Sequence, residues 1–203
     1  MSALELDHVV LAVLDLGDAA RELEARYGLA SVAGGRHPGW GTENRIVPLG
    51  DSYLELVAVA DEEEAASTLF GRWVAARRAA PFAPLAWAVR AGDLDAHAAR
   101  LGLAVEDGER TRPDGTILRW RLAGVAEAEA EPFLPFFIEW EDEAAHPGRT
   151  DGRHPNVEQL ALAGDAARLE DWLDDAPLPV TVSAGAPALV GIALSGGLTL
   201  GQG

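Results

Sequence analysis

Two short apolar stretches decide the fold, YLELV at residues 53–57 and FFIEW at residues 136–140. Each carries one glutamate, Glu55 in the first stretch and Glu139 in the second. A carboxylate in a strand suited to a core is costly to bury unless it is paired with a charge or bound to a cation. Because each stretch closes a similar segment of chain, we interpret the two as matching strands of a duplicated unit that share one site.

The duplicated units span residues 4–59 and 84–140. Each begins with an apolar strand, at residues 7–13 in the first unit and 85–89 in the second. A helix is predicted after each strand, and both helices end at a glycine that closely follows an arginine, as is typical of helix termini.

The middle of each unit repeats a GTxxRxxxxG motif, at residues 41–50 and again at 115–124, an offset of 115 − 41 = 74. The two glutamates are offset by 139 − 55 = 84. The second unit therefore contains an insertion before its last strand, and the acidic, alanine-rich stretch at 127–131 is the candidate for it.

A third, partial unit follows. The letters GDAAR at residues 17–21 recur at 164–168, after a strand predicted at 157–162. We expect residues 1–155 to form one domain and residues 156–203 a partial third module packed on it, because repeated units bury their apolar faces against one another. The tail would either cover an edge of the sheet or pair with a second copy of the chain in a homodimer.

Composition restricts the class of protein. The chain has 203 residues, 48% of them hydrophobic, which is typical of a globular protein with a real core. Its net charge of −17 argues against nucleic acids and anionic membranes as partners. There is no lysine and no cysteine, which excludes Schiff-base and thiolate chemistry. The first residues lack the features of a signal peptide, so a cytoplasmic location is expected.

Side chains alternate between the two faces of a strand, so the pattern predicts which residues meet. We expect His8, Glu55 and Glu139 to share the mixed face of the sheet, opposite the face that packs under the helices. Arg119 and Arg121 share one face of a neighbouring strand.

Four segments carry a resemblance to a known family: GRHPGWGTEN at 35–44, LGDSYLEL at 49–56, RPDGT at 112–116 and PFFIEW at 135–140. With the repeated strand–helix–three-strand unit, the chain resembles the vicinal oxygen chelate superfamily, and more closely its glyoxalase-like domain proteins. The resemblance spans most of residues 4–156. It implies an α+β fold in which paired βαβββ modules form an eight-stranded cup-shaped sheet, with the third partial module at the C-terminus.

In that superfamily a divalent metal is usually held by residues on the first and fourth strands of each unit. Carried over to this chain, His8, Glu55 and Glu139 match three of the four positions, whereas residues 84–88 offer no ligand at the fourth. The resemblance implies a divalent metal (Mn, Fe, Ni, Zn or Mg) that chelates and activates an oxygenated substrate, with Glu55 and Glu139 also catalytic. Isomerase, lyase and dioxygenase chemistry all remain open.

Further side chains are expected to line the mouth of the cup or to bind a substrate carboxylate. These candidate substrate-binding residues are His37, Trp40, Asn44, Arg45, Arg119 and Arg121. The other histidines are expected elsewhere. His97 is placed on a helix surface, and His146 and His154 lie in a solvated connector rich in glycine and proline.

Several alternatives stay open. Glu55 and Glu139 could pair with the arginines across the cup instead of binding a metal. The missing fourth ligand also suits a metal-free protein of the same fold that binds or sequesters a small molecule, and the acidity of the chain would suit a cationic one. A degenerate scaffold without a ligand is the weakest of these readings.

Overall fold

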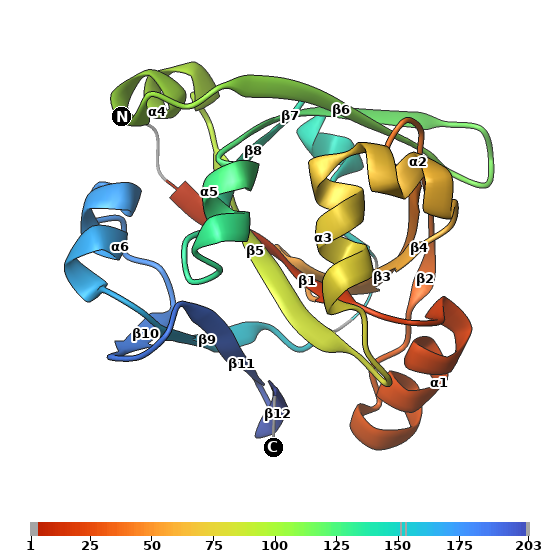
Figure 1. Cartoon of the computed structure of the whole chain (residues 1–203). Coiled ribbons are helices and arrows are strands. Elements are labelled where there is room, and N and C mark those ends of the chain that lie inside the picture. Colours follow the sequence, from red (N-terminus) through yellow and green to blue (C-terminus); the bar gives the residue numbers. More distant parts are fainter. Residues whose placement is uncertain (1–3, 151, 153, 202–203) are drawn as a thin grey trace.

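The computed structural model describes residues 4–150, 152 and 154–201. Eight strands close into a barrel in the order β1-β4-β3-β2-β6-β7-β8-β5, which confirms the eight-stranded sheet expected from the paired modules (Figure 1). A separate sheet of four strands, β10-β9-β11-β12, follows at the C-terminal end.

Each module contributes half of the barrel. The first comprises β1 (Leu4–Ala12), α1 (Leu16–Tyr27), β2 (Val32–His37), β3 (Thr42–Pro48) and β4 (Tyr53–Val59). The second comprises β5 (Ala83–Ala91), α4 (Leu94–Leu101), β6 (Val105–Thr111), β7 (Ile117–Ala123) and β8 (Phe136–Trp140). The halves join along the antiparallel pair β1 and β5, and more loosely where Arg36 of β2 pairs with Thr111 of β6.

The helix boundaries follow from the capping residues. Asp15 caps α1 and Asp93 caps α4 through side-chain oxygens that accept backbone N–H groups of the first turn. Both helices end at a left-handed glycine, Gly28 (φ 67°) and Gly102 (φ 70°), where a side chain would be strained. The predicted helix ends are therefore confirmed in both modules.

Three helices outside the repeated strand–helix–three-strand pattern shape the barrel interior. The linker between the modules forms α2 (Glu62–Ser67) and α3 (Leu69–Arg77), and the insertion in the second module forms α5 (Val125–Ala130). Residues Thr68–Phe70 and Val125–Ala126 reach the interior from these helices. A short 3₁₀ helix at Glu143–Ala145 follows β8.

The C-terminal sheet comprises β9 (Val157–Ala163), β10 (Val180–Ser183), β11 (Ala188–Leu194) and β12 (Leu198–Gly201), with α6 (Ala166–Leu173) after β9. Its first strand, β9, lies in the middle of the sheet, parallel to β10 and antiparallel to β11. The pairing differs in the first module, where the first strand, β1, is parallel to the fourth strand, β4. The two copies of the GDAAR sequence also occupy different positions in their helices, because Asp165 is the N-cap of α6 whereas Asp18 lies inside α1. The segment thus has the strand–helix–three-strand order of a module, but its strands pair in a different order.

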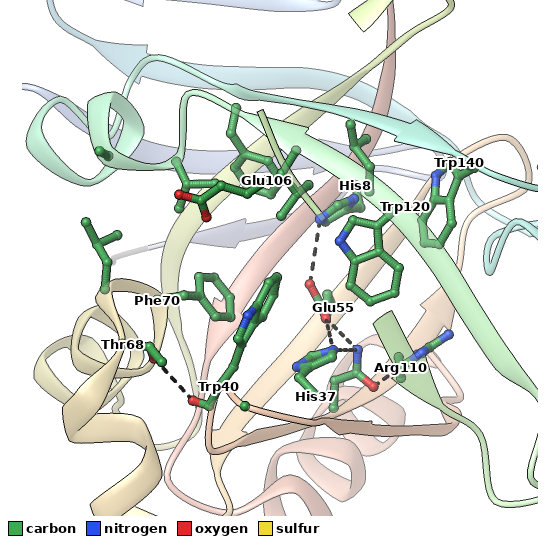
Figure 2. A pocket seen from close by; sticks show the side chains of 18 of the residues that line it. His8, His37, Trp40, Glu55, Thr68, Phe70, Glu106, Arg110, Trp120 and Trp140 are labelled. Atoms are coloured by element: carbon green, nitrogen blue, oxygen red, sulfur yellow. Dashed lines mark hydrogen bonds and ion pairs between the residues drawn. The ribbon is translucent and has the colours of Figure 1, made fainter. Parts of the chain in front are cut away.

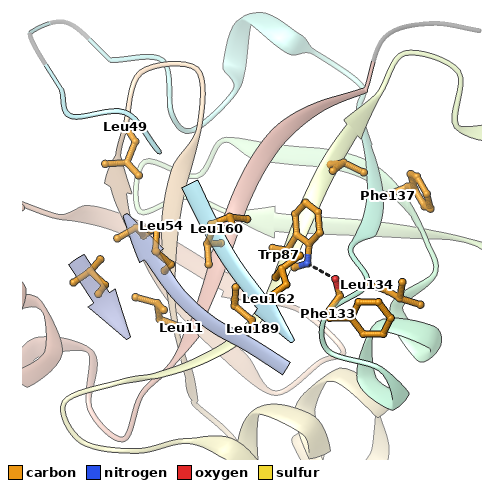
Figure 3. Close-up of a cluster of buried hydrophobic side chains, with 14 of the residues drawn as sticks. Leu11, Leu49, Leu54, Trp87, Phe133, Leu134, Phe137, Leu160, Leu162 and Leu189 are labelled. Carbon is orange, nitrogen blue, oxygen red and sulfur yellow. Dashed lines mark hydrogen bonds between the residues drawn. The ribbon is translucent and has the colours of Figure 1, made fainter. Parts of the chain in front are cut away.

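The barrel wall separates two apolar clusters. The outer cluster lies between the wall and the C-terminal sheet, where Leu160, Leu162 and Leu189 pack with Leu11 and Trp87 (Figure 3). The inner cluster lines the barrel and includes Trp120, Phe136 and Trp140. Among the described residues, no helix has the length and apolar character that crossing a bilayer requires.

Candidate functional site

A cavity of about 280 Å³ lies inside the barrel (Figure 2). One part of it carries polar side chains from both modules, and the remainder is lined by aromatic rings. The polar lining residues are His8, His37, Asn44, Tyr53, Glu55, Glu106 and Arg110, with Thr68 at one side. The aromatic lining residues are Trp40, Phe70, Trp120, Phe136 and Trp140. A mostly apolar cavity with a few convergent polar groups is typical of a small-molecule site.

His8 is oriented by the residue beside it in the chain. In the pairing of β1 with β5, Leu6 faces Val89 and His8 faces Ala88, so Asp7 is the extra residue of a β-bulge. Nδ1 of His8 lies 2.6 Å from Oδ1 of Asp7. Because a carboxylate only accepts hydrogen bonds, the neutral form of the ring carries its proton on Nδ1, and its Nε2 acceptor is then on the cavity side.

Asp7 is itself fully buried and held by several donors. Its Oδ2 accepts hydrogen bonds from Trp140 Nε1 at 3.0 Å and His146 Nε2 at 3.1 Å, and Arg90 lies at 3.6 Å. Burial alone would raise the pKa of Asp7, but the hydrogen bonds from His146 and His8 outweigh burial and lower it far below 3.8. Asp7 is therefore a permanent carboxylate behind His8.

Glu55 occupies the centre of the polar part of the cavity (Figure 2). Its two oxygens lie 3.6 Å from Nε2 of His8 and 3.6 Å from Nε2 of His37. The side-chain amide of Asn44 donates a hydrogen bond to the oxygen on the His37 side. The carboxylate on β4 is thus placed between two imidazoles and fixed by an amide.

All four hydrogen-bonding positions of the Asn44 amide are used. Oδ1 accepts from Gly35 N–H at 2.9 Å and from Arg110 Nη1 at 3.0 Å, while Nδ2 faces Glu55 and, at 3.2 Å, Nε2 of His37. These partners fix the orientation of the amide, since N–H groups can only face its oxygen. The backbone of β2 must come close for this, and a Cβ at Gly34 would lie 1.9 Å from Asn44 Oδ1.

His37 is buried and neutral. Its Nε2 accepts from Asn44, so its proton is on Nδ1, 2.9 Å from Thr42 Oγ1. Burial lowers the pKa of His37 to about 4; Glu55 opposes that shift, while Arg110 and His8 reinforce it.

The aromatic wall, as we call Trp40, Phe70, Trp120 and Trp140, consists of rings in contact. Trp40 lies 5.4 Å from Phe70 and 6.2 Å from Trp120, and Trp120 lies 5.4 Å from Trp140, measured between ring centroids. Tilted and edge-on contacts at these distances are favourable for aromatic rings. The wall gives the cavity flat apolar surfaces suited to a planar ligand.

The structure does not bring Glu139 to this cluster, which corrects the expectation that it joins His8 and Glu55. In the parallel pairings, His8 faces Tyr53 and Ala88 faces Phe136, so the residue that matches Glu55 is Ile138 and not Glu139. A shift of one residue moves a side chain to the other face of the sheet. Glu139 lies on the outer face, where it pairs with Arg121 and accepts the Leu94 N–H at 3.3 Å.

The three arginines predicted to bind substrate also lie outside the barrel. Arg45 donates to Ser31 Oγ at 2.9 Å, and Arg119 pairs with Glu109 at 3.4 Å. Arg121 pairs with Asp95 at 3.0 Å in addition to Glu139. His37, Trp40 and Asn44, in contrast, do line the cavity as predicted.

The residues present do not fit the divalent metal that the resemblance implied. Glu139 is on the wrong face, and the N–H group of Asn44 lies between His37 and Glu55, where a cation would have to sit. Asn44 cannot reverse its amide without turning Nδ2 toward the N–H groups of Gly35 and Arg110. Within residues 4–150, 152 and 154–201, no group of three or more His, Cys, Asp or Glu side chains is arranged to hold a metal ion.

Sequence patterns missed several side chains of the site. Arg110 lies in a polar strand that alternates without an apolar face, so nothing marked it as inward-facing. His146 was expected in solvent but is 2% exposed, and its ring closes the network around Asp7. His97, expected on a helix surface, is buried against Phe137 with ring centroids 5.6 Å apart, away from the cavity. Of the cavity residues that were missed, only Tyr53 could have been predicted from the sequence, because it lies on the same face of its strand as Glu55.

Comparisons with known proteins place this geometry in a family. The sequence model described as the glyoxalase-like domain matches residues 6–171 of the 203. A solved structure of a hypothetical protein from Staphylococcus aureus is 15% identical with a TM-score of 0.71, over 94% of this chain and 90% of that one. A variant of methylmalonyl-CoA epimerase from Streptomyces coelicolor, in complex with 2-nitronate-propionyl-CoA, is 21% identical with a TM-score of 0.51, over 71% and 99%. At these identities the structures share a fold. No curated protein matches the chain.

Proposed function

The chain belongs to the glyoxalase-like domain family, and from that premise we propose that it is an enzyme that moves a proton on a small carbonyl compound bound inside the barrel. The observation that carries the proposal is the Asp7–His8 pair. His8 Nδ1–H is held by a buried carboxylate at 2.6 Å, and Nε2 is directed to the cavity 3.6 Å from Glu55. A carboxylate that fixes one ring nitrogen leaves the other as a general base.

The proposed step is a proton transfer that uses residues of this chain alone. Nε2 of His8 takes a proton from the carbon next to a carbonyl, which leaves an enolate and an imidazolium. The negative charges of Asp7 and Glu55 stabilise that imidazolium. If the proton returns to the same carbon, the result is hydrogen exchange with solvent or inversion of that carbon. If it is delivered to a different atom, the substrate is isomerised. No step passes through a metal.

A second candidate is a binding protein that sequesters its ligand unchanged. The observation that favours it is the aromatic wall, whose four residues all line the cavity. Stacking on such rings provides affinity without any chemistry. Binding of a carbonyl compound without any proton exchange would support this candidate over the enzyme.

Solvent exchange tests the proposal without knowledge of the natural substrate. Phenylpyruvate, acetoacetate and pyruvate are incubated with the protein in D₂O, and loss of the proton signal next to the carbonyl is followed by NMR. We expect faster exchange with the wild-type protein for at least one compound, and a loss of about 10²- to 10⁴-fold in His8→Gln and Glu55→Gln.

Matched controls come from the same chain. Glu139→Gln removes a glutamate from the outer face of the barrel, and His154→Gln removes a histidine from the connector, so both should retain the wild-type rate. Exchange that persists in His8→Gln, an equal loss in Glu139→Gln, or the absence of catalysed exchange with all three compounds would contradict the proposal.

A further inference from the structure

Arg110 is a buried cation that lacks a carboxylate partner among the residues the structure describes. Its side chain is 3% exposed and lines the cavity from β6. Within the described part of the chain its hydrogen bond goes to a neutral acceptor, Asn44 Oδ1, at 3.0 Å. A guanidinium carries five N–H donors, and an arginine removed from water is normally paired with an anion.

Tyr53 presents a second donor to the same cavity. The residue is 3% exposed and lines the cavity, yet its hydroxyl has no hydrogen-bond partner among the described residues. Burial, followed by the charges of Asp7 and Glu55, raises the pKa of Tyr53 well above 10.0, so the hydroxyl keeps its proton. A guanidinium that uses one of its donors and a protonated hydroxyl thus face the same cavity.

The positions of these donors relative to the base are specific. The ring of Tyr53 stacks on His8 with centroids 4.7 Å apart and planes inclined by 14°. Asn44 separates the charges, since Arg110 contacts its oxygen while Glu55 contacts its nitrogen. A negative group bound at Arg110 is therefore held apart from Glu55 by the width of an amide.

We propose that Arg110 and Tyr53 bind the carboxylate of a small, flat acid. The apolar part of this acid packs against the aromatic wall, and the carbon next to its carboxylate or carbonyl faces His8. The cavity, about 280 Å³, lies just below the usual range for ligand sites, which favours a small ligand. The substrate class is thus a monoanionic aromatic or conjugated carboxylic acid, despite the net charge of −17 on the chain.

This inference rests on the proposed function for the role of the acid as substrate, but its test measures binding alone. Benzoate, benzamide and benzylammonium share a flat ring and differ in charge, and each is titrated into the intact protein by calorimetry. We expect the wild-type protein to bind benzoate at least about tenfold more tightly than benzamide, because charge-assisted hydrogen bonds are stronger than neutral ones.

Variants assign the preference to the two donors. Arg110→Gln should reduce the ratio of benzoate to benzamide affinity about 10- to 100-fold, and Tyr53→Phe, which keeps the ring on His8, about 3- to 10-fold. Arg119→Gln is the matched control, because Arg119 is half-exposed on the outer face and pairs with Glu109. It should leave the ratio unchanged. If Arg110→Gln does not fold by circular dichroism, Arg110→Lys and Tyr53→Phe decide the test, since each must still weaken benzoate more than benzamide.

Three results would overturn the inference: tighter binding of benzamide or benzylammonium than benzoate, an unchanged ratio in the Arg110 variants, or no benzoate binding up to about 10 mM. Failure of the two proposals is distinguishable. Selective benzoate binding without proton exchange would contradict only the proposed enzyme, whereas His8-dependent exchange without a preference for anions would contradict only the carboxylate subsite.

Discussion

Nδ1 of His8 lies 2.6 Å from Oδ1 of Asp7, although the two residues are neighbours in one strand. In a regular strand their side chains would point to opposite faces. The bulge at Asp7 removes that alternation, so the carboxylate reaches the ring of the next residue. The proposed base and the carboxylate that orients it are therefore adjacent residues in the sequence. The other hydrogen bonds to Asp7 come from Trp140 and His146, at the other end of the barrel domain.

Asp7→Asn should lower the proton-exchange rate about 10²- to 10⁴-fold while leaving the cavity intact. An amide offers one acceptor oxygen to three converging donors, and its NH₂ group favours the other tautomer of His8, with the proton on Nε2. The measurement is exchange in D₂O as a function of pH. Asp95→Asn, an exposed carboxylate that pairs with Arg121, is the control. A wild-type rate in Asp7→Asn would show that Asp7 has only a structural role.

The stability of the protein should fall as the pH is lowered from 6.5 to 4. His37 has a pKa of about 4 in the folded protein against 6.5 ordinarily, so across this window the unfolded chain binds a proton that the native protein does not. Stability therefore rises with pH here, and one such group contributes on the order of 3 kcal/mol over the whole window. Asp7, whose pKa is depressed, adds a further loss only below about its unfolded value of 3.8.

Urea unfolding at a series of pH values measures this slope. Because burial also lowers the pKa of His97, part of the slope should remain in His37→Gln, but it should be clearly shallower than in the wild-type protein. His154→Gln is the control, since that histidine lies in the connector. A His37→Gln variant with the full wild-type slope would show that His37 is not the group responsible.

Gly34→Ala should disrupt the polar part of the cavity. The added Cβ would lie 1.9 Å from Asn44 Oδ1 and 2.6 Å from the backbone oxygen of Asn44, so β2 or Asn44 has to move. Overpacking of this kind costs about 1–3 kcal/mol. Displacement of Asn44 should also release Glu55 and weaken binding of benzoate. Thermal unfolding and calorimetry provide the two measurements.

Gly17→Ala is the control for that substitution. Gly17 lies in the first turn of α1, where a Cβ would meet the side chains of Asp15 and Arg21 at 3.2 and 3.4 Å. Alanine in a helix is favoured over glycine by about 0.5–1 kcal/mol, so this variant should be no less stable than the wild-type protein. Equal stability of the two variants would show that the close approach at Gly34 is not required.

Repeats and alternation within strands predicted the modules and the shared face of His8 and Glu55, and the family resemblance implied the cup. The face of the sheet on which Glu139 lies depends on the register between β5 and β8. Aligning the glutamates of FFIEW and YLELV suggested a register that differs by one residue from the observed one. Arg110 and His146 are placed by the closure of the barrel and by the path of the connector, which leave no local pattern. Strand alternation therefore located His8 and Glu55, the Gly-rich loop indicated His37 and Asn44, and tertiary structure alone brought in Arg110 and His146.

We expect the C-terminal sheet to unfold together with the barrel because the two share an apolar cluster. Leu160 and Leu162 of β9 are buried in the cluster that covers Leu11 and Trp87 of the barrel wall. The link is reinforced by Trp172, whose Nε1 donates to Pro135 O at 2.9 Å, directly before β8. Leu160→Ala should thus lower the free energy of unfolding by about 2–5 kcal/mol, in one transition that also reports on the barrel.

Val190→Ala in the adjacent strand β11 is the control, because Val190 is 42% exposed and its truncation should change stability by no more than about 0.5 kcal/mol. Unfolding is followed by circular dichroism and by tryptophan fluorescence, to which five of the six tryptophans contribute from residues 1–155, and the two probes should give coincident curves in Leu160→Ala. Because the outer cluster is shared between the sheet and the wall, loosening one side exposes the apolar surface of the other. Two separate transitions, with the barrel signal unchanged by Leu160→Ala, would mean that the C-terminal sheet folds as an independent unit.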